Sequence, residues 1–506
     1  MSRLHFLTQF LNHPSPANIA ALVGLGVIVL GLCYLASRVT LAVIVAVGMF
    51  LELFSGSWAY MGIPVPIDRA VLLLGLAILV LKGPRFVSER QIVLRPLHIV
   101  ILAAVAWAAA SAIIAGTMFT KLGFYAFLDR FGLVPFALFC LAPFVFGSAR
   151  QRNVFLGLMV AMGLYLSFTA LLEGAHLYRL VVPSYIGDQN VGIQWGRARG
   201  PMLETTGNGF CIFVGAVGAA TALRTWHDGR ARALCYLTIL LAFPAEFLTL
   251  TRGVWIGAFV GTVGALLLVK RTRRWVFPSL GVAGLAVVLA LAVSPTLNHE
   301  AVQSADRQSS VWDRQNTDLA ALTIVAEHPL TGIGWEKFIT ESPNFMVQQP
   351  GYPITGLNLE VHNVFLSHAA ELGIPGLLLW SLGLAGAARR GLLPGKIRWR
   401  RPRRSSRSGI LPQAAATPRP VAPQPGTLET MPEWWVVWRP AGLAIFLCFG
   451  VIASLAPFSE PLPNGLLWTW LGILAVPYTS RARSRAFARA GSWARQRGLS
   501  LAPTSA

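Results

Sequence analysis

Long apolar runs occupy most of this 506-residue chain, and they leave it few ways to fold. A helix needs about 20 mostly apolar residues to cross the roughly 30 Å hydrocarbon core of a bilayer. Stretches of this kind lie at 17–36, 40–57, 64–82, 96–118, 125–147, 153–174, 208–223, 234–250, 254–269, 275–293, 363–387, 440–457 and 464–479. Because backbone in lipid must satisfy its own hydrogen bonds, we expect an all-α, polytopic membrane bundle of about 12–13 transmembrane helices.

Charge and cysteine content agree with a membrane protein. Only 12% of the residues are charged, whereas about one quarter is usual in soluble domains. The first apolar run has no small-residue cleavage site after it, so we expect it to be retained as a helix. The chain contains no CxxC pair, and its cysteines lie in or beside apolar runs, which favours buried small hydrophobes over disulfides or metal ligands. They are Cys33, Cys140, Cys211, Cys235 and Cys448.

The net charge of +21 is mainly a signal of membrane orientation. Cytoplasmic loops are enriched in Lys and Arg, and most of these residues gather in short segments that alternate with the apolar runs. The segments are 82–96, 148–153, 224–233, 270–274, 388–433 and 480–506. With these in the cytoplasm, 175–207, 294–362 and the turn 250–253 lie on the other side. This placement explains the basic composition without nucleic acid as a partner.

The same pattern predicts the domain organisation. N-terminal transmembrane helices occupy 1–174, and a central region, 175–387, contains both long outer segments. A basic, Pro/Ala-rich stretch, 388–433, is expected to be a cytoplasmic linker held near anionic lipid. C-terminal transmembrane helices follow at 434–479, and a basic cytoplasmic tail occupies 480–506.

Familiar catalytic motifs are missing from the sequence. It contains no GxxxxGK[ST], no GxGxxG between a strand and a helix, and no HExxH. His362, His368 and Glu371 first suggest a metal cluster. Residues six positions apart on a helix lie about 240° apart, however, so the two histidines face different ways. We therefore predict no metal site.

Arginines in the outer segments are the most informative polar residues. Outer loops are usually poor in arginine, and retained ones suggest a phosphate or pyrophosphate, whose oxygens the guanidinium binds two at a time. Two alternatives stay open: each arginine only snorkels or pairs with an acid such as Asp306, Asp313 or Glu204, and His362 only caps a helix. The candidate residues are Arg197, Arg199, Arg252, Arg307, Arg314 and His362.

At these positions the chain resembles the O-antigen ligase and O-antigen polymerase superfamily of bacterial envelope glycosyltransferases. The matching stretches are Thr251-Arg252-Gly253, then Arg314 followed by AALTIVAEHPLTGIGWEKF, and then HNVFLSHAAELGIPGLLLW, which begins at His362. The resemblance covers roughly residues 190–385. The chain departs from the family at Asp318, where an aromatic is usual, and this keeps Arg307 as an alternate to Arg314.

The resemblance implies a GT-C-like fold and glycosyl transfer without metal or cofactor. The expected location is the plasma (inner) membrane, with the catalytic face periplasmic or extracellular. Donor and acceptor would be a glycan on undecaprenyl pyrophosphate and a sugar hydroxyl of a glycan or glycolipid: lipid A-core for a ligase, another lipid-linked repeat for a polymerase. His362 would be the base, Arg252 and Arg314 would hold the departing pyrophosphate, and Arg199, with Arg197 or Arg307, would help bind the donor.

A transporter or flippase of lipid-linked glycans is an alternative of another class. Such a protein should carry ionisable residues near the bilayer midplane and often has two similar halves. Few ionisable residues lie inside the predicted spans, among them Asp129, Arg130 and Glu371, with Arg439 at the edge of one, and neither half repeats the other. The sequence therefore favours an enzyme over a transporter.

Overall fold

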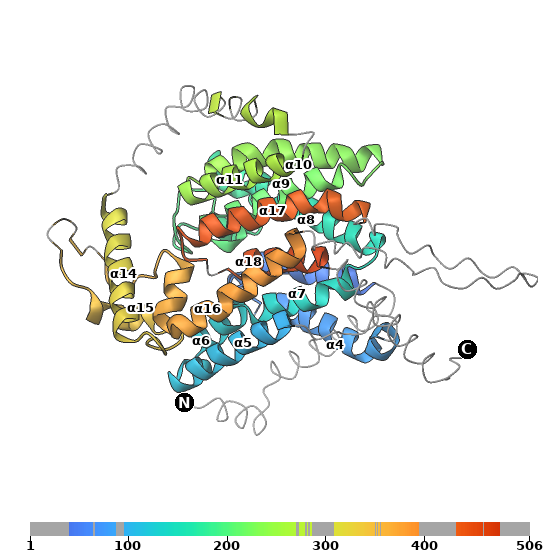
Figure 1. Cartoon of the computed structure of the whole chain (residues 1–506). Coiled ribbons are helices and arrows are strands. Elements are labelled where there is room, and N and C mark those ends of the chain that lie inside the picture. The colour runs from blue at the N-terminus through green and yellow to red at the C-terminus, as the bar shows by residue number, and fades with distance from the viewer. Residues whose placement is uncertain are drawn as a thin grey trace, which may run out of the picture.

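The computed structural model describes residues 40–63, 66–87, 96–269, 273–278, 281, 284–285, 308–349, 351, 353–354, 356–393, 432–458 and 460–475. Every regular element in these ranges is helical, which confirms the all-α class. The long helices run side by side as one bundle, with α9, α10 and α11 on one side and α4 and α5 on the other (Figure 1).

The helices, in chain order, are α3 (Leu41–Leu51), α4 (Ile67–Val87), α5 (Pro96–Ile114), α6 (Lys121–Tyr125), α7 (Leu133–Val145), α8 (Ala149–Gly174), α9 (Thr205–Ala222), α10 (Gly229–Leu248), α11 (Arg252–Leu268), α14 (Gln308–Glu327), α15 (Phe338–Glu341), α16 (Val364–Leu392), α17 (Glu433–Ala453) and α18 (Pro461–Leu474). A π-helical turn, η4 (Ala126–Phe131), joins α6 to α7.

The apolar runs become helices, as predicted. Six helical stretches in the described ranges are long and apolar enough to cross a membrane, namely Pro96–Ile114, Lys121–Val145, Ala149–Gly174, Gly229–Leu248, Val364–Leu392 and Glu433–Ala453. Leu41–Phe54 and Arg252–Leu268 are shorter apolar helices. The predicted span 17–36 and most of 275–293 lie outside the described residues, as do Cys33, most of the linker and the tail. The protein is thus a multi-pass membrane protein.

Helix α18 forms the centre of the bundle. All its residues from Leu462 to Leu474 are buried, including Trp468 and Trp470, and it packs against α7, α9, α16 and α17. Cys211, Cys235 and Cys448 are buried as free thiols, and Cys140 is a half-buried free thiol, in agreement with their reading as small hydrophobes. A central helix of this kind needs no polar face, and its sequence has almost none.

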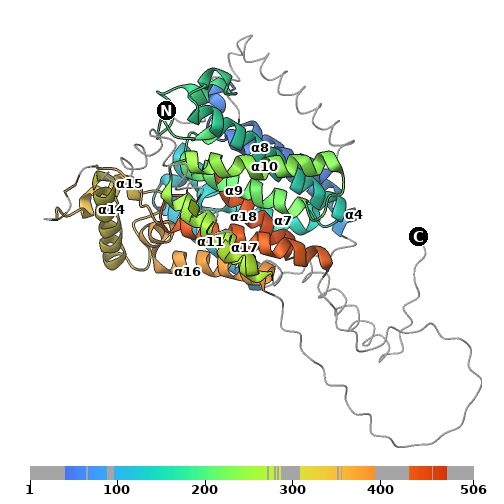
Figure 2. The ribbon, with the colours of Figure 1, turned by 90° about the horizontal axis from the view of Figure 1, so that it is seen from above.

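Helices α14 and α15 lie beyond one end of the bundle, which we call the α14 end (Figures 1 and 2). Four bundle helices begin near one another at this end: α9, α11, α16 and α18. The Thr205 and Thr251 hydroxyls, at the starts of α9 and α11, are 2.7 Å apart. The side chain of Glu460, before α18, lies against Gly207 of α9, and Glu204 and Glu360, just before α9 and α16, interact electrostatically.

Helix α16 is interrupted at Gly373, and the turn after α14 forms hydrogen bonds with the backbone groups that lose their helical partners there. Gly373 adopts φ 70°, and Pro375 has no N–H, so the carbonyls of Ala370 and Glu371 lose their helical donors. Ile333 N–H and Gly334 N–H donate to these carbonyls instead, at 3.0 and 3.1 Å. In return, Ile374 N–H donates to the Pro329 carbonyl at 2.8 Å. The PLTGIG turn (329–334) and the ELGIPG segment (371–376) are therefore joined by backbone hydrogen bonds in both directions.

This contact should not tolerate a side chain at Gly332. The residue has φ +63°, and an added Cβ would lie 2.4 Å from the carbonyl carbon of Glu371. We expect Gly332→Ala to destabilise the protein by roughly 1–3 kcal/mol, measured by thermal unfolding in detergent. The control is Gly157→Ala on α8, where nothing lies within 4 Å of the added Cβ. Equal stability of the two variants would contradict this account.

Candidate active site

His362 lies directly before α16 but does not cap the helix. Asn363 is the cap: its side-chain oxygen accepts from the N–H groups of Phe365 and Leu366, at 3.0 and 3.1 Å. The imidazole Nδ1 of His362 is buried, and no partner for it exists in the described part of the chain. The Asn363 cap argues against the helix-cap interpretation of His362.

The surroundings of His362 favour its neutral form. Burial is the main factor that lowers the pKa of the imidazole, and the positive charge of Arg314 lowers it further. Glu360 and Asp313 act in the opposite direction but do not outweigh these effects. Since the ordinary pKa of histidine is about 6.5, the ring is mostly unprotonated at neutral pH. An unprotonated imidazole is able to accept a proton.

Arg314, on another element, acts electrostatically on His362, and Arg252, on a third element, acts on Arg314. Arg314 lies on the second turn of α14, and Arg252 is the first residue of α11. Burial and the nearby charge of Arg252 lower the pKa of Arg314, so the two guanidinium groups are close enough to repel each other. These two exposed arginines concentrate positive charge at the α14 end, and Arg314 brings that charge within reach of His362.

Asp318 offsets part of this positive charge. It lies one turn after Arg314 on α14. Burial raises the pKa of its carboxyl group, and the charge of Arg314 opposes that rise. The two side chains are therefore close enough to attract each other electrostatically.

The start of α11 adds backbone donors to the same place. Thr251 precedes the helix but does not cap it with its side chain, because its hydroxyl bonds to Thr205 and to the Thr249 carbonyl. The first N–H groups of a helix carry partial positive charge and bind anions well. At Arg252, the positive charge of the side chain and the partial positive charge of the helix start would therefore both attract an anion.

Arg199 is in a different situation from Arg252 and Arg314. Its side chain is 1% exposed, and its guanidinium donates to the carbonyls of Ile186, Asp188 and Val191, at 3.1 and 2.5 Å for the first two. The guanidinium also lies over the ring of Trp195, 4.7 Å from its centroid. These contacts hold the loop 186–199 together. Arg197 is half-buried in the same loop, and Arg307 lies outside the described residues.

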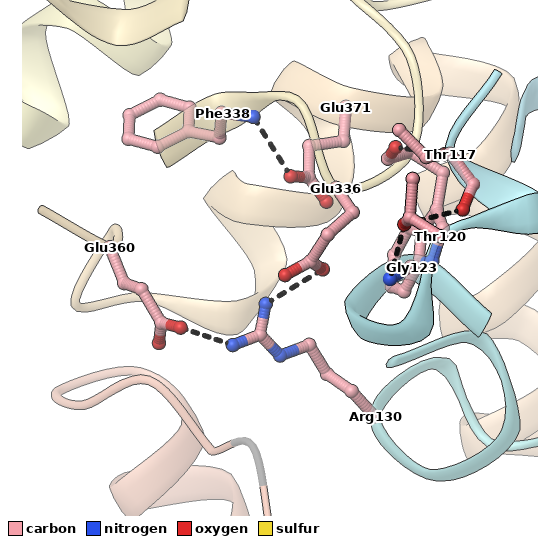
Figure 3. A network of polar contacts seen from close by, with 9 residues as sticks. Thr117, Thr120, Gly123, Arg130, Glu336, Phe338, Glu360 and Glu371 are labelled. Atoms are coloured by element: carbon pink, nitrogen blue, oxygen red, sulfur yellow. Dashed lines mark hydrogen bonds and ion pairs between the residues drawn. The ribbon is translucent and has the colours of Figure 1, made fainter. Parts of the chain in front are cut away.

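The structure adds a network that the sequence analysis did not assign to the site (Figure 3). Arg130 of η4 donates from one guanidinium nitrogen to Glu336, at 3.1 Å, and from the other to Glu360, two residues before His362. Glu371 of α16 accepts from the Phe338 N–H at 3.1 Å. The sequence signal was a charged pair, Asp129-Arg130, within an apolar run.

His368, on α16, has a packing role. His368 is 1% exposed, and its ring lies 4.9, 5.6 and 5.9 Å from those of Trp380, Phe131 and Trp335, measured between centroids. It lies away from Arg314 and is surrounded by aromatic side chains. Within the described residues, no three His, Cys, Asp or Glu side chains are grouped so that they could hold a metal ion.

These features define a multi-pass helical membrane protein with a buried histidine beside a positively charged site at one end of its bundle. Residues 237–381 match the family model described as O-antigen ligase. That stretch contains Arg252, Arg314 and His362, and it confirms the relation to the O-antigen ligase and polymerase superfamily. No curated protein matches the chain.

Proposed function

We propose that this protein transfers a glycan from a lipid pyrophosphate to an acceptor sugar hydroxyl on the outer face of the plasma membrane. The observation that carries the proposal is the position of Arg314, which acts electrostatically both on His362 and on Arg252, residues of two other elements far apart in the sequence. A positive site next to a neutral imidazole suits a reaction in which an anion departs while a hydroxyl loses its proton.

In the proposed reaction, His362 accepts the proton of the acceptor hydroxyl. The hydroxyl oxygen then forms a bond to the anomeric carbon of the donor sugar. The bond from that carbon to the pyrophosphate oxygen breaks, and the pyrophosphate leaves with the electron pair. Arg252, Arg314 and the first N–H groups of α11 stabilise the negative charge on the departing group. The donor supplies the energy, and no nucleotide sugar is required.

The two forms of this activity differ only in the acceptor. A ligase would use a glycolipid such as lipid A-core, and a polymerase would use another lipid-linked repeat unit. We favour the ligase, in keeping with the description of the matched family. Deleting the gene and separating the envelope glycans on a gel tests the choice: a polymerase mutant accumulates single repeats, whereas a ligase mutant lacks long glycans on the acceptor.

Four charges that lie in or beside the predicted spans are engaged in contacts with other segments of the protein. Asp129 pairs with Arg69 of α4, and Arg130 pairs with Glu336 and Glu360. The Nε of Arg439 donates to the Leu392 carbonyl at 2.6 Å, and Glu371 accepts from Phe338. These contacts support the enzyme over the transporter.

The proposal requires the α14 end to face away from the cytoplasm. A reporter enzyme that is active only outside the cytoplasm should be active when fused near residue 330, and it should be inactive when fused near residue 410. The reason is the concentration of Lys and Arg in the segments on the opposite side of the predicted spans. Activity of both fusions, or of neither, would contradict the assigned orientation.

A further inference from the structure

The π-helical turn η4 directs two neighbouring charges to different partners. It interrupts the helical stretch Lys121–Val145, and π-turns within helices are frequent at functional sites. Asp129 pairs with Arg69 on α4. Its neighbour Arg130 pairs with Glu336 and Glu360, both of which belong to the non-helical segments at the α14 end. The turn thus connects the bundle to the segments around the candidate site.

The two carboxylates that pair with Arg130 belong to the segment before His362 and to the segment after the PLTGIG turn. Glu360 is two residues before His362, in the segment that leads into α16. Glu336 follows the PLTGIG turn, which is also held by a 3.1 Å bond from Trp335 N–H to the Ser111 hydroxyl. Figure 3 shows the Arg130 guanidinium between these two carboxylates. Arginine suits this task because its planar fork fixes the directions of both bonds.

The three side chains of this network are largely shielded from water. The side chains of Arg130, Glu336 and Glu360 are 15%, 5% and 31% exposed. In such surroundings, removal of one partner leaves a charge without compensation, and the segment that carries it must move. For Glu360, such a movement would carry His362 with it.

We propose that Arg130 is a positioning residue, which fixes the segment of His362 by holding Glu360 while Glu336 anchors the guanidinium. This inference rests on the proposed role of His362 as the base. Arg130 does not contact the reacting groups in this account. Its effect on catalysis is exerted entirely through the place and the electrostatic surroundings of the imidazole.

The test uses the full-length protein in detergent, with an undecaprenyl-pyrophosphate-linked donor and kcat measured against pH. Arg130→Met should lower kcat on the order of tenfold to a hundredfold, as a displaced catalytic group does, and leave KM for the donor nearly unchanged. The Arg130→Met variant should also shift the acid limb of the profile, where kcat falls as His362 becomes protonated, to higher pH. The charged groups that face His362 are Arg314, Asp313 and Glu360, and without Arg130 the charge of Glu360 favours the imidazolium more strongly.

A second variant, Glu360→Gln, keeps the test decisive if Arg130→Met does not fold. It removes the charge that favours the imidazolium, so the acid limb should move to lower pH while kcat falls. The matched control is Arg69→Met, which breaks the ion pair of the adjacent Asp129 and should lower stability without moving the limb.

The outcomes separate this inference from the proposed function. If His362→Gln is inactive but Arg130→Met and Glu360→Gln keep the wild-type kcat and acid limb, the positioning role is wrong and the function stands. If Arg69→Met moves the limb as far as Arg130→Met, the effect is general destabilisation, and the inference fails. If His362→Gln is fully active, the role of His362 as the base is wrong, and the inference fails with it. If the wild-type protein transfers no glycan, the proposed function itself fails.

Discussion

His362→Ala is expected to lower the rate of glycan transfer by about 10²–10⁴, the usual contribution of acid–base catalysis by a side chain. The reason is that the buried Nδ1 has no partner among the described residues and that burial, with the charge of Arg314, favours the neutral ring. His362→Gln should be nearly as inactive, because glutamine forms hydrogen bonds but does not accept the proton. Donor binding should survive in both variants, since the arginines supply it.

The measurement is transfer by purified variants with the lipid-pyrophosphate donor, with a chelator present throughout. His328→Ala is the matched control, because His328 is exposed at the end of α14 and should be dispensable. Full activity of His362→Gln would remove His362 from the chemistry. Inhibition of the wild-type enzyme by the chelator would show that a metal takes part in the reaction, contrary to our prediction.

Arg252→Ala and Arg314→Ala should each reduce transfer by roughly 10²–10³ or more while the protein still inserts into the membrane. This is the loss expected when a donor to a developing anion is removed. Because Arg252 and Arg314 repel each other, removing either one should not unfold the site. Arg252→Lys should also be impaired, since an ammonium group lacks the fork that binds two oxygens.

The control is the double variant Arg403→Ala, Arg404→Ala in the linker, which should stay nearly fully active. Transfer and donor binding are measured separately on each variant. Loss of transfer in the linker variant, together with normal transfer in Arg252→Ala, would contradict the proposed anion site.

The candidate site was partly predictable from residue type. Arg252, Arg314 and His362 stood out because outer segments rarely retain arginine and because they matched a family pattern in order. Arg199 stood out for the same reason, yet its guanidinium bonds to three backbone carbonyls of its own loop. A sequence shows that an arginine is present, but it does not show what occupies its donors. Its predicted part in donor binding stays a prediction.

The sequence by itself determined the helices and the class of the protein, because crossing a bilayer depends on a local property, about 20 apolar residues in a row. It predicted one uninterrupted span at 363–387, however, and did not predict the break in α16 at Gly373. Only the tertiary structure decided how that break is repaired, by Ile333 and Gly334. It likewise decided that Arg130 reaches Glu336 and Glu360, more than 200 residues away. Such pairs depend on how helices pack in three dimensions, and no local pattern records that.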